Sequence, residues 1–591
     1  MAKFVCYDFE VFKYDFLLGC IVIDGDGEHL FQSWNRQEIT DFYKEHQSDI
    51  WVGWNSMDYD RHILQSVLKG QNPYLTSKNI VEKHETPYFF LPLYDFDLMR
   101  MFKTKVSLKL TELIKGDSIE TTDVDFNLDR PLTDEEKQLT ERYNGFDLKQ
   151  TVYNFKKFYY NFELQIDIIK EFNLDLKTYL EATGTKLAAG ALGAVKNPKL
   201  KYEKIEPIHY DNLQLKNKRL LDYYFNEEFR LPPSGETIKV GNAELVLGSG
   251  GLHYAQSKVH YDKLLYADIS GAYNTVMIVY DLFSRSISEK GKELYKYMFK
   301  NEKALKKTNP KKRKVYKKIL LSVYGAQMNE NTDFSDPWKG LLVPITLQLF
   351  MIDLFEKIED KVTFVQINTD GIMIKVNEPY TEEEVIAIIN AWEERTGFQL
   401  KFEHLYNLWQ RDVNNYVFQT EEGELEYRGE ALKNYDISDA GYASGEIFDC
   451  KEPSIIAKGI IDYLIYGITP EETVEKYKHD LKNFQYACKK SSFDYLTYDI
   501  KYLNSQEVTS VDYGTICRAF AWNDKNAYGM VYKHKTGKSQ KVSNLPQSVF
   551  VYNGEILSNE AYNMISPKID FDYYVNRIYE RMFKFVGLDD K

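Results

Sequence analysis

The chain has 591 residues, of which 43% are hydrophobic and 28% are charged, and this composition excludes collagen-like and wholly disordered proteins. Its length predicts three or four domains, and its net charge of −14 argues against a general nucleic-acid coat. The five cysteines are too scattered for a CxxC metal knuckle or a dense disulfide framework, and no apolar run is long enough for a signal peptide or a membrane span.

The first fifty residues predict β-strands, with a hairpin turning at residues 24–27. Asp8 and Glu10 lie two positions apart on the first predicted strand. Because strand side chains alternate, both carboxylates point to one face and Phe9 points to the other. Such a pair can hold a hard divalent cation, although paired surface acids are the commoner reason for this spacing.

Two more acidic motifs follow in chain order. Residues 54–60 (WNSMDYD) come directly after a short predicted strand. Residues 132–190 are predicted to be mostly helical, and Tyr143 and Asp147 are four positions apart there, so they share one helix face. Taken singly, each motif is explained by ordinary polar residues on the protein surface.

Jointly the motifs DxE, Nx3YD and Yx3D resemble the three exonuclease motifs of the proofreading family B DNA polymerases, of the small phage type. The resemblance implies that Asp8, Glu10, Asp60 and Asp147 bind two metal ions, which activate water and stabilise charge on the cleaved phosphate. It further implies that Tyr143 orients the water and that Asn55 holds the frayed strand. Asp58 competes with Asp60 for the second motif, and the preceding Tyr59 favours Asp60. Residues 107–110 (SLKL) and 115–117 (KGD) resemble the single-strand-binding segment, which implies DNA contact by Ser107 and Leu108, although an amphipathic helix start would look the same.

The middle of the chain carries a second set of motifs. Residues 240–268 predict strands, and Asp268 stands where a strand gives way to a helix, five residues before Tyr273. Residues 289–325 predict two helices broken at residues 308–310, because Pro310 disfavours helix before it. Residues 290–318 hold 13 Lys or Arg against two acids, which indicates a local site for a polyanion. Residues 361–376 predict a hairpin turning at Asn368-Thr369-Asp370-Gly371.

In this order the motifs resemble motifs A, B and C of the same family. Taken singly, they are an ordinary strand-to-helix turn, a basic helix ending in glycine and a common hairpin. Motif B is Kx3NSxYG in the family, and here Leu321 replaces its Asn; in motif C, Asn368 replaces the first Asp and Gly371 the Ser. The resemblance implies that Asp268 and Asp370 bind two ions for nucleotidyl transfer.

The resemblance also implies nucleotide-binding and DNA-binding residues. Tyr273, Lys317, Tyr324, Arg313 and Lys306 are expected to bind the incoming nucleotide, with Tyr273 excluding a 2′-hydroxyl. Gly250 and Gly251 resemble the YxGG hinge, and Tyr416 the primer-contacting KxY motif. Residues 571–578 resemble the thumb helix, whereas residues 430–565 match nothing that we can name.

The expected fold is an α+β multidomain chain, with an RNase H-like exonuclease domain followed by a right-hand polymerase of palm, fingers and thumb. The expected boundaries are 1–185 for the exonuclease, 186–288 for a linker and first palm segment, 289–330 for the fingers, 331–428 for the second palm segment, and 429–591 for the thumb with a C-terminal extension. That extension is expected to enlarge the thumb or to dock a clamp or helicase.

The expected function is DNA-directed DNA polymerase with 3′–5′ proofreading exonuclease, replicating phage or mobile-element DNA in the cytoplasm of an infected bacterial host. Only 49 residues separate Asp268 from Lys317 and 45 separate Gly325 from Asp370, so a nucleic-acid primer is expected rather than a priming protein. Mg²⁺ is expected at both sites, with Mn²⁺ able to substitute. The expected partners are primer–template DNA, dNTPs and replisome proteins such as helicase, clamp or single-strand-binding protein, with no membrane. The alternatives are a stand-alone 3′–5′ exonuclease with a degenerate palm, and a non-catalytic DNA-binding subunit.

Overall fold

A computed structural model gives the fold of the chain in two compact units. Unit 1 comprises residues 1–163, 175–181 and 431–580, and unit 2 comprises residues 164–174, 182–430 and 581–591. The residues that the structure describes are 3–102, 105–120, 124–125, 128–205, 208–224, 235–248, 250–438, 442, 445–505 and 507–586. Among these, no helix is both long and apolar enough to cross a membrane.

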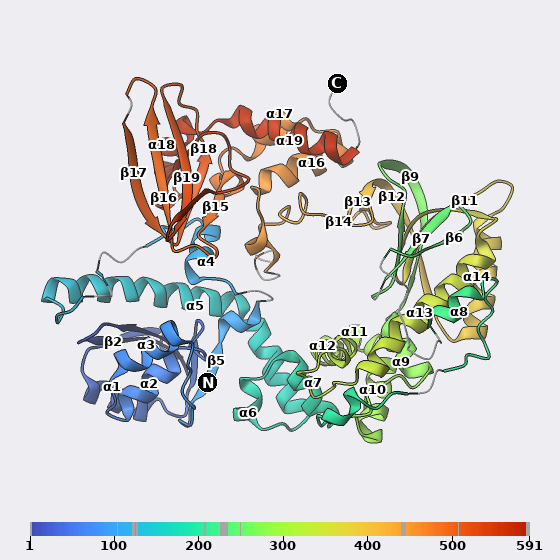
Figure 1. Cartoon of the computed structure of the whole chain (residues 1–591), viewed down its shortest axis with the longest axis horizontal. Coiled ribbons are helices and arrows are strands. Elements are labelled where there is room, and N and C mark those ends of the chain that lie inside the picture. The colour runs from blue at the N-terminus through green and yellow to red at the C-terminus, as the bar shows by residue number, and fades with distance from the viewer. Residues whose placement is uncertain are drawn as a thin grey trace. The chain divides into compact units, whose positions relative to one another are not determined.

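Unit 1 begins with a five-stranded sheet of order β3-β2-β1-β4-β5 (Figure 1). β1 pairs antiparallel with β2 and parallel with β4, and β5 continues the sheet parallel to β4. The strands are β1 Phe4–Val11, β2 Phe16–Ile23, β3 Glu28–Ser33, β4 Ile50–Gly53 and β5 Tyr94–Asp97. The predicted strands and the turn at residues 24–27 are confirmed.

Helices cover both faces of this sheet. The helices that follow its strands are α1 Arg36–Glu45, α2 Asp60–Leu68 and α3 Pro73–Lys83. The odd-numbered residues of β1, from Val5 to Val11, join one apolar core with side chains of α1 and α2. The even-numbered Phe4 packs instead against Phe155 and Phe162 of the long helix α5 Asp134–Glu171. Strand alternation therefore turns the even-numbered side chains of β1 toward α5.

The C-terminal part of unit 1 contains two smaller sheets of order β15-β18-β21 and β17-β16-β19-β20. Its strands are β15 Tyr486–Lys489, β16 Tyr495–Tyr502, β17 Val508–Gly514, β18 Ile516–Ala521, β19 Ala527–Lys535, β20 Lys538–Lys541 and β21 Val549–Val551. Its helices are α16 Ser454–Tyr466, α17 Pro470–Tyr477, α18 Asn559–Ile565 and α19 Phe571–Val586.

Helix α4, Leu108–Lys115, joins these sheets to the N-terminal part of unit 1, because it packs against β15 and β18. Arg518 of β18 is fully buried there, and its guanidinium donates to the carbonyls of Leu113 and Asp117 at 3.1 and 2.8 Å. Its Nε and Nη1 also donate, to Oε1 of Gln485 and to the carbonyl of Gly554, so four hydrogen bonds tie this side chain to the junction. Residues 431–580 thus share one unit with the first sheet, although they lie at the other end of the sequence.

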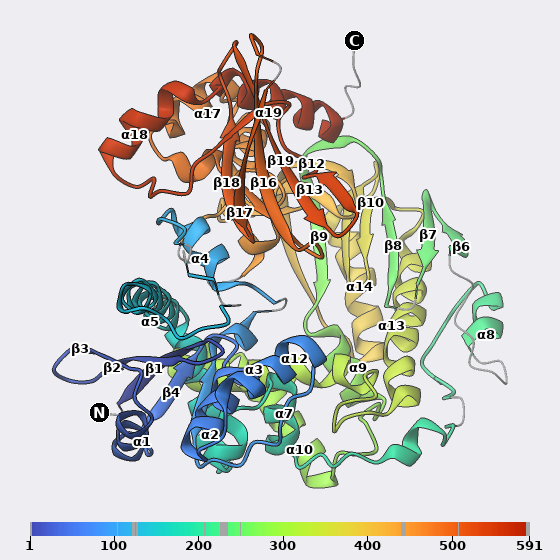
Figure 2. The ribbon, with the colours of Figure 1, turned by 60° about the vertical axis from the view of Figure 1, so that its left-hand side comes forward.

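Unit 2 is built on a nine-stranded sheet of order β14-β13-β12-β9-β11-β10-β8-β7-β6 (Figure 2). Its strands are β6 Thr237–Val240, β7 Ala243–Leu247, β8 Leu252–Ala255, β9 Val259–Ile269, β10 Val362–Asn368, β11 Gly371–Val376, β12 Leu400–Asp412, β13 Asn415–Gln419 and β14 Leu425–Arg428. Helices α13 Pro337–Ile358 and α14 Glu382–Thr396 lie beside it, and most of α13 is buried. The long strand β9 lies next to the hairpin β10–β11.

The remaining helices of the chain are mostly in unit 2. They are α6 Leu176–Leu180, α7 Gly184–Leu192, α8 Arg219–Tyr224, α9 Ala272–Val279, α10 Glu289–Glu302, α11 Leu305–Thr308 and α12 Pro310–Gln327, with short 3-10 helices at Leu98–Met101, Pro198–Lys201, Glu446–Asp449, Leu481–Phe484 and Ser566–Lys568. The predicted break before Pro310 is confirmed, and the structure adds the one-turn helix α11 ahead of it. α12 packs on α7 where Gly184 leaves room for the side chain of Lys318.

Candidate active sites

The first candidate site lies where β1 faces α5. Asp8 and Glu10 project from the even-numbered face of β1, and Asp147 projects from α5. One oxygen of each carboxylate lies within 4.8 Å of the others, a spacing that a single divalent cation can bridge. The structure therefore brings together three of the four residues predicted to bind metal here.

Helix α5 approaches the sheet closely because Gly19 has no side chain. A Cβ at Gly19, which is paired with Asp8 across the β1–β2 ladder, would lie 1.7 Å from Oδ1 of Asn144. Asn144 is fully buried and donates from Nδ2 to Oδ2 of Asp8 at 2.9 Å. Asn144 therefore orients one of the acids, a role that the sequence analysis missed although the residue lies inside the Yx3D motif.

Asp60, the fourth predicted ligand, stands at the start of α2 beside the other three. Its Oδ1 accepts the backbone N–H of Phe9 at 3.1 Å, and the residue is 3% exposed. The loop before it is held by Asp97 at the end of β5, whose carboxylate accepts the N–H groups of Asn55 and Met57 at 2.9 and 3.3 Å. Asn55 sits in this loop with a φ of 63°, which asparagine tolerates better than most residues.

Burial and mutual repulsion disfavour ionisation of these acids. Desolvation, together with the charge of Asp147, raises the pKa of Asp8 to about 7. Desolvation raises the pKa of Asp147 to about 6, and the pKa values of Glu10 and Asp60 also rise, through burial and then the charge of Asp8. A cation among them would remove both penalties.

The donor atoms of this site fit a hard cation. Oδ1 of Asp147 and Oδ1 of Asn55 are buried and have no hydrogen-bond partner among the described residues. A buried polar atom without a partner is costly unless an ion or water completes its shell. The residues present therefore suit Mg²⁺ or Mn²⁺, as predicted.

Two further groups surround Asp147. Tyr143 is largely buried, its hydrogen bond lowers the pKa of Asp147, and burial beside that carboxylate raises the pKa of the Tyr143 phenol well above its usual range. Nζ of Lys109 lies 4.8 Å from the centroid of the Tyr143 ring and donates to the carbonyl of Glu120. Its positive charge lowers the pKa of Asp147 and of Glu10, after the larger opposing effect of burial. Lys109 lies in the segment singled out from the sequence, but it was not named as functional.

The predicted DNA-binding residues of that segment have a structural role in the fold. Ser107 is the N-cap of α4, and its hydroxyl accepts the N–H of Leu110 at 3.3 Å. Leu108 begins the helix and is half-buried. The helix-start interpretation is thus confirmed, and contact of either residue with DNA stays a prediction.

The second candidate site lies in the central strands of the nine-stranded sheet. Asp268 is near the end of β9, and Asp370 is in the turn between β10 and β11. Gly371, the residue after Asp370, is directly opposite Asp268 in the antiparallel β9–β11 ladder. Thr369 adopts a φ of 60° to close the turn, and the carbonyl of Asp370 accepts the N–H of Ile269 at 3.0 Å. The hairpin therefore fixes the two predicted acids side by side.

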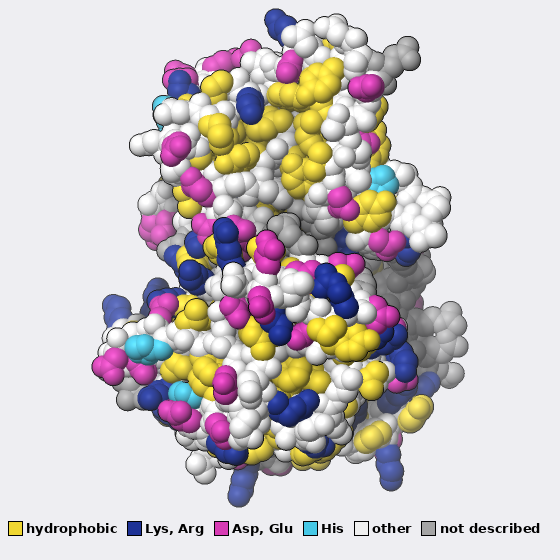
Figure 3. Space-filling view, turned by 90° about the vertical axis from the view of Figure 1, so that its left-hand side faces the viewer, with side chains coloured by type: hydrophobic (Ala, Val, Ile, Leu, Met, Phe, Trp, Pro, Cys, Tyr) yellow, Lys and Arg dark blue, Asp and Glu magenta, His cyan; other side chains and the backbone are white. Residues whose placement is uncertain are grey.

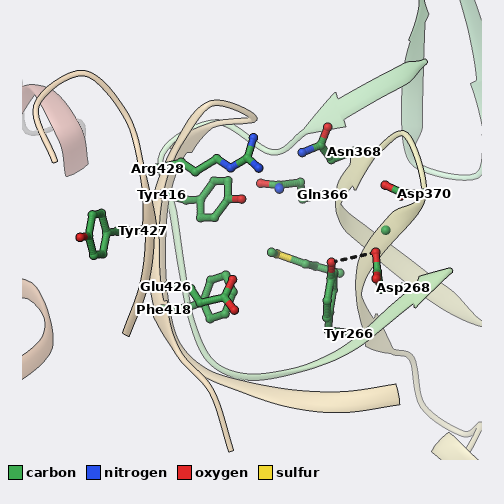
Figure 4. Close-up of a pocket in the computed structure, with 12 residues that line it drawn as sticks. Tyr266, Asp268, Gln366, Asn368, Asp370, Tyr416, Phe418, Glu426, Tyr427 and Arg428 are labelled. Carbon is green, nitrogen blue, oxygen red and sulfur yellow. Dashed lines mark hydrogen bonds between the residues drawn. The ribbon is translucent and has the colours of Figure 1, made fainter. Parts of the chain in front are cut away.

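These acids open into a pocket of about 230 Å³ (Figure 4). The pocket is lined by Tyr266, Asp268, Gln366, Asn368, Asp370, Gly371, Met373, Tyr416, Phe418, Glu426, Tyr427 and Arg428. Burial and then the charge of Asp370 raise the pKa of Asp268 to about 6. Burial also raises the pKa of Asp370, whereas the Arg428 guanidinium lowers it. Tyr416 thus lines the predicted site, and Arg428 is a charged residue that no sequence motif indicated.

The departures from motif C have local packing reasons. A Cβ at Gly371 would lie 2.8 Å from the hydroxyl of Tyr266, which donates to Oδ1 of Asp268 at 3.3 Å. A serine would collide with this hydroxyl, so Tyr266 and Gly371 are a matched pair. Asn368 is opposite His253 in the β8–β10 ladder, and a hydrogen bond that the His253 ring donates to Asn368 raises the pKa of His253 against the larger effect of burial.

The glycines upstream pack against the same hairpin. A Cβ at Gly251 would lie 2.2 Å from Oγ1 of Thr369, so Gly251 lets β8 approach the turn. The carbonyl of Gly250 accepts the hydroxyl of Tyr273 at 2.7 Å, whereas Ser249 of the same motif lies outside the described residues. Tyr273 stacks on Tyr324 with ring centroids 4.1 Å apart. The structure therefore joins the predicted residues of motifs A and B, and DNA contact by either glycine stays a prediction.

The basic segment is partly used for internal ion pairs. Arg313 contacts Glu302 at 2.7 Å, and Lys311 and Lys312 contact Asp167 and Glu171 of α5 at 3.1 and 2.6 Å.

Lys306 and Lys317 are exposed. Lys317 precedes Tyr324 by two helical turns on α12, which places both on one face. Among the predicted triphosphate ligands, the structure thus leaves Lys306 and Lys317 accessible and holds Arg313 in a pair.

No protein-family model matches the sequence, and no curated protein matches it. Among solved structures the chain is similar to the family B DNA polymerase from the hyperthermophilic archaeon Pyrobaculum calidifontis. The two are 12% identical, the match covers 100% of this chain and 79% of that chain, and the TM-score is 0.43. At this low similarity, an assignment of function has to rest on the two sites themselves.

Glu112 of α4 gives a test of the electrostatics beside the first site. It is 4% exposed, and burial followed by the charge of Asp147 raises its pKa from 4.5 to about 8. Between these pH values the folded chain keeps a proton that the unfolded chain has lost, so the free energy of unfolding falls as pH rises. We expect Glu112→Gln to raise the free energy of unfolding by on the order of 2–4 kcal/mol at pH 8, and by little at pH 4.5.

The measurement is denaturant unfolding in EDTA at both pH values, with the exposed Glu135→Gln as the control. An equal effect of Glu112→Gln at pH 4.5 and pH 8 would show that Glu112 is ionised in the folded chain.

Proposed function

We propose that this chain is a DNA-directed DNA polymerase with 3′–5′ exonuclease activity, which extends a nucleic-acid primer on phage or mobile-element DNA in a bacterial cytoplasm. The observation that carries the proposal is the presence of two separate carboxylate sites, Asp8–Glu10–Asp147 in unit 1 and Asp268–Asp370 in unit 2. One site suits hydrolysis and the other suits nucleotidyl transfer. A proofreading polymerase needs both reactions.

Two divalent cations at each site, Mg²⁺ or Mn²⁺, would supply activation of the attacking oxygen and neutralisation of charge on the phosphate. At the first site Asp8, Glu10, Asp60 and Asp147 would hold them. Asn144 and the Phe9 N–H fix the orientation of Asp8 and Asp60. Tyr143, hydrogen-bonded to Asp147, would orient the water that cleaves the 3′-terminal phosphodiester, and Asn55 would hold the frayed strand.

At the second site Asp268 and Asp370 would hold the ions, with the deoxynucleotide above them. Tyr273 would pack under its sugar and exclude a 2′-hydroxyl, a position supported by its stacking on Tyr324. Lys317 and Lys306 would bind the triphosphate, and Arg313 could join only by leaving Glu302. Tyr416 would contact the primer end beside Arg428. The first acid of motif C is absent, but two carboxylates would suffice to hold two ions.

The domain proposal follows the same division. The sheet order β3-β2-β1-β4-β5 supports an RNase H-like exonuclease within residues 1–185. We propose palm segments at 186–288 and 331–428, fingers at 289–330, and a thumb with its extension at 429–591. Every residue from Asp268 to Asp370 is described, and helices α9 to α13 with strand β10 take up most of the interval. These leave no room for an inserted domain that docks a priming protein, which supports a nucleic-acid primer.

The proposal is tested with a 5′-labelled DNA primer annealed to a longer template in Mg²⁺. We expect the wild-type chain to extend the primer with dNTPs and to degrade it without them. Asp8→Ala should lose degradation by at least about 10³-fold and keep extension, and Asp370→Ala should do the reverse, because each removes a ligand of one site only. EDTA should abolish both reactions.

Asp262→Ala is the matched control, because Asp262 is an exposed aspartate at the far end of β9 from Asp268. Degradation without extension would instead identify a stand-alone exonuclease with a degenerate palm. Neither activity would indicate a DNA-binding subunit. A labelled protein–nucleotide adduct would contradict the nucleic-acid primer.

Lys109→Met tests the electrostatics of the proposed exonuclease. The substitution keeps the side-chain stem but removes the positive charge that lowers the pKa of Asp147. We expect exonuclease activity at pH 7 to fall about tenfold or more, and the acidic limb of its pH–rate profile to move to higher pH.

The control is Lys105→Met, since Lys105 is highly exposed and lies near Asp58 rather than the ligands. Extension by Lys109→Met should equal that of the wild type. A lower rate with an unmoved pH profile would mean that Lys109 acts on the substrate alone.

A further inference from the structure

The four-stranded sheet β17-β16-β19-β20 in unit 1 takes no part in either proposed reaction. Its register places Tyr495, Thr497, Asp499 and Lys501 of β16 opposite His534, Tyr532, Met530 and Tyr528 of β19. Because side chains alternate along each strand, these eight residues share one face of the sheet. This face is defined here as the tyrosine face.

The opposite face is the packed one. Leu496 and Val531 are fully buried, and the hydroxyl of Tyr498 donates to the carbonyl of Val549 at 3.0 Å. Gly529 lies against the same carbonyl: a Cβ at this position would be 2.1 Å from the Val549 oxygen. The tyrosine face is therefore turned away from the core of unit 1.

The tyrosine face offers aromatic rings to solvent. Tyr495 is 41% exposed and stacks on His534 with centroids 4.9 Å apart. Tyr528 and Tyr532 are half-buried and lie four residues apart on β19, a separation of about 13 Å. Figure 3 shows hydrophobic side chains, a class that includes tyrosine, gathered in a strip on the upper part of the view. The rings thus form a row along the strands rather than one isolated contact.

Lysines lie beside these rings in a chain that is acidic overall. Residues 525–554 contain five lysines and no Asp or Glu, whereas the whole chain carries −14. Lys501 is exposed opposite Tyr528, and Lys541 lies opposite Tyr532 in the β19–β20 ladder, so both lysines are on the tyrosine face. Two acids share this side of the sheet. Asp499 accepts the hydroxyls of Thr497 and Ser510 on its Oδ1 at 3.0 and 2.6 Å, and Asp512 of β17 is exposed opposite Thr497. A lysine therefore lies beside each of the rings of Tyr528 and Tyr532.

We propose that the tyrosine face binds single-stranded DNA, with unpaired bases stacked on Tyr495, Tyr528 and Tyr532 and phosphates held by Lys501 and Lys541. Aromatic rings between lysines suit single strands, because every unpaired base exposes a π-face while the backbone needs only positive charge. Paired bases in a duplex cover these faces, which favours the single strand as the occupant. This site goes beyond the proposed polymerase and exonuclease reactions and does not depend on either of them.

The test is equilibrium binding of a fluorescent dT20 oligonucleotide to the full chain in EDTA, which prevents metal-dependent degradation. The double variant Tyr528→Ala/Tyr532→Ala should bind at least about tenfold more weakly, because each stacked base is worth about 1–3 kcal/mol. Tyr528→Phe/Tyr532→Phe should bind as the wild type does, since it keeps both rings. Lys501→Gln/Lys541→Gln should reduce the slope of log K against log salt by about 1.4.

The matched control is Tyr88→Ala, which removes a tyrosine that is 85% exposed elsewhere in unit 1. Unchanged dT20 binding by the double alanine variant would overturn the proposal. An equal loss of binding to a blunt duplex would also overturn it, because it would assign the face to duplex DNA. If dT20 binding were unchanged but binding of a replication protein were lost, the face would be a protein-docking surface. Primer extension is measured separately, so its failure would leave the binding result standing.

Discussion

The structure depends most on the cost of placing several carboxylates together away from water. Asp8, Glu10 and Asp147 present oxygens within 4.8 Å of one another. Burial raises the pKa of each, and repulsion from neighbouring carboxylates raises the pKa of Asp8 and Glu10 further. Such a cluster of buried carboxylates destabilises the folded chain when no cation is bound and becomes favourable when it surrounds a divalent cation. Keeping this cluster lowers the free energy of unfolding, and the residues around the cluster limit that loss.

Those surroundings explain several otherwise ordinary residues. Gly19 lets α5 approach β1, so that Asn144 can donate to Asp8. Asp97 holds the loop that leads to Asp60. At the second site Gly371 makes room for Tyr266, whose hydroxyl donates to Asp268. In each case a small or polar neighbour positions an acid that would otherwise be free to turn away, so the positioning residues belong to the sites as much as the ligands do.

Sequence reasoning predicted what depends on local spacing. The alternation of β1 put Asp8 and Glu10 on one face, the four-residue spacing put Tyr143 and Asp147 on one helix face, and the turn at residues 368–371 placed Asp370. It missed what depends on distant packing. Nothing local relates Gly19 to Asn144 or Arg428 to Asp370, because their contacts exist only after the sheets form. The ion pair of Arg313 with Glu302 was missed because it depends on the packing of α12 against α10. The shared unit of residues 1–163 and 431–580 was missed because it depends on contacts between segments far apart in the sequence.

The central claim is that the two carboxylate sites each bind divalent cations. The most direct measurement is anomalous X-ray scattering from crystals of the chain soaked in Mn²⁺, recorded at the manganese edge. The account predicts peaks within bonding distance of Asp8, Glu10 and Asp147 and, separately, of Asp268 and Asp370. Ordered carboxylates at both sites with no anomalous peak at either would contradict it.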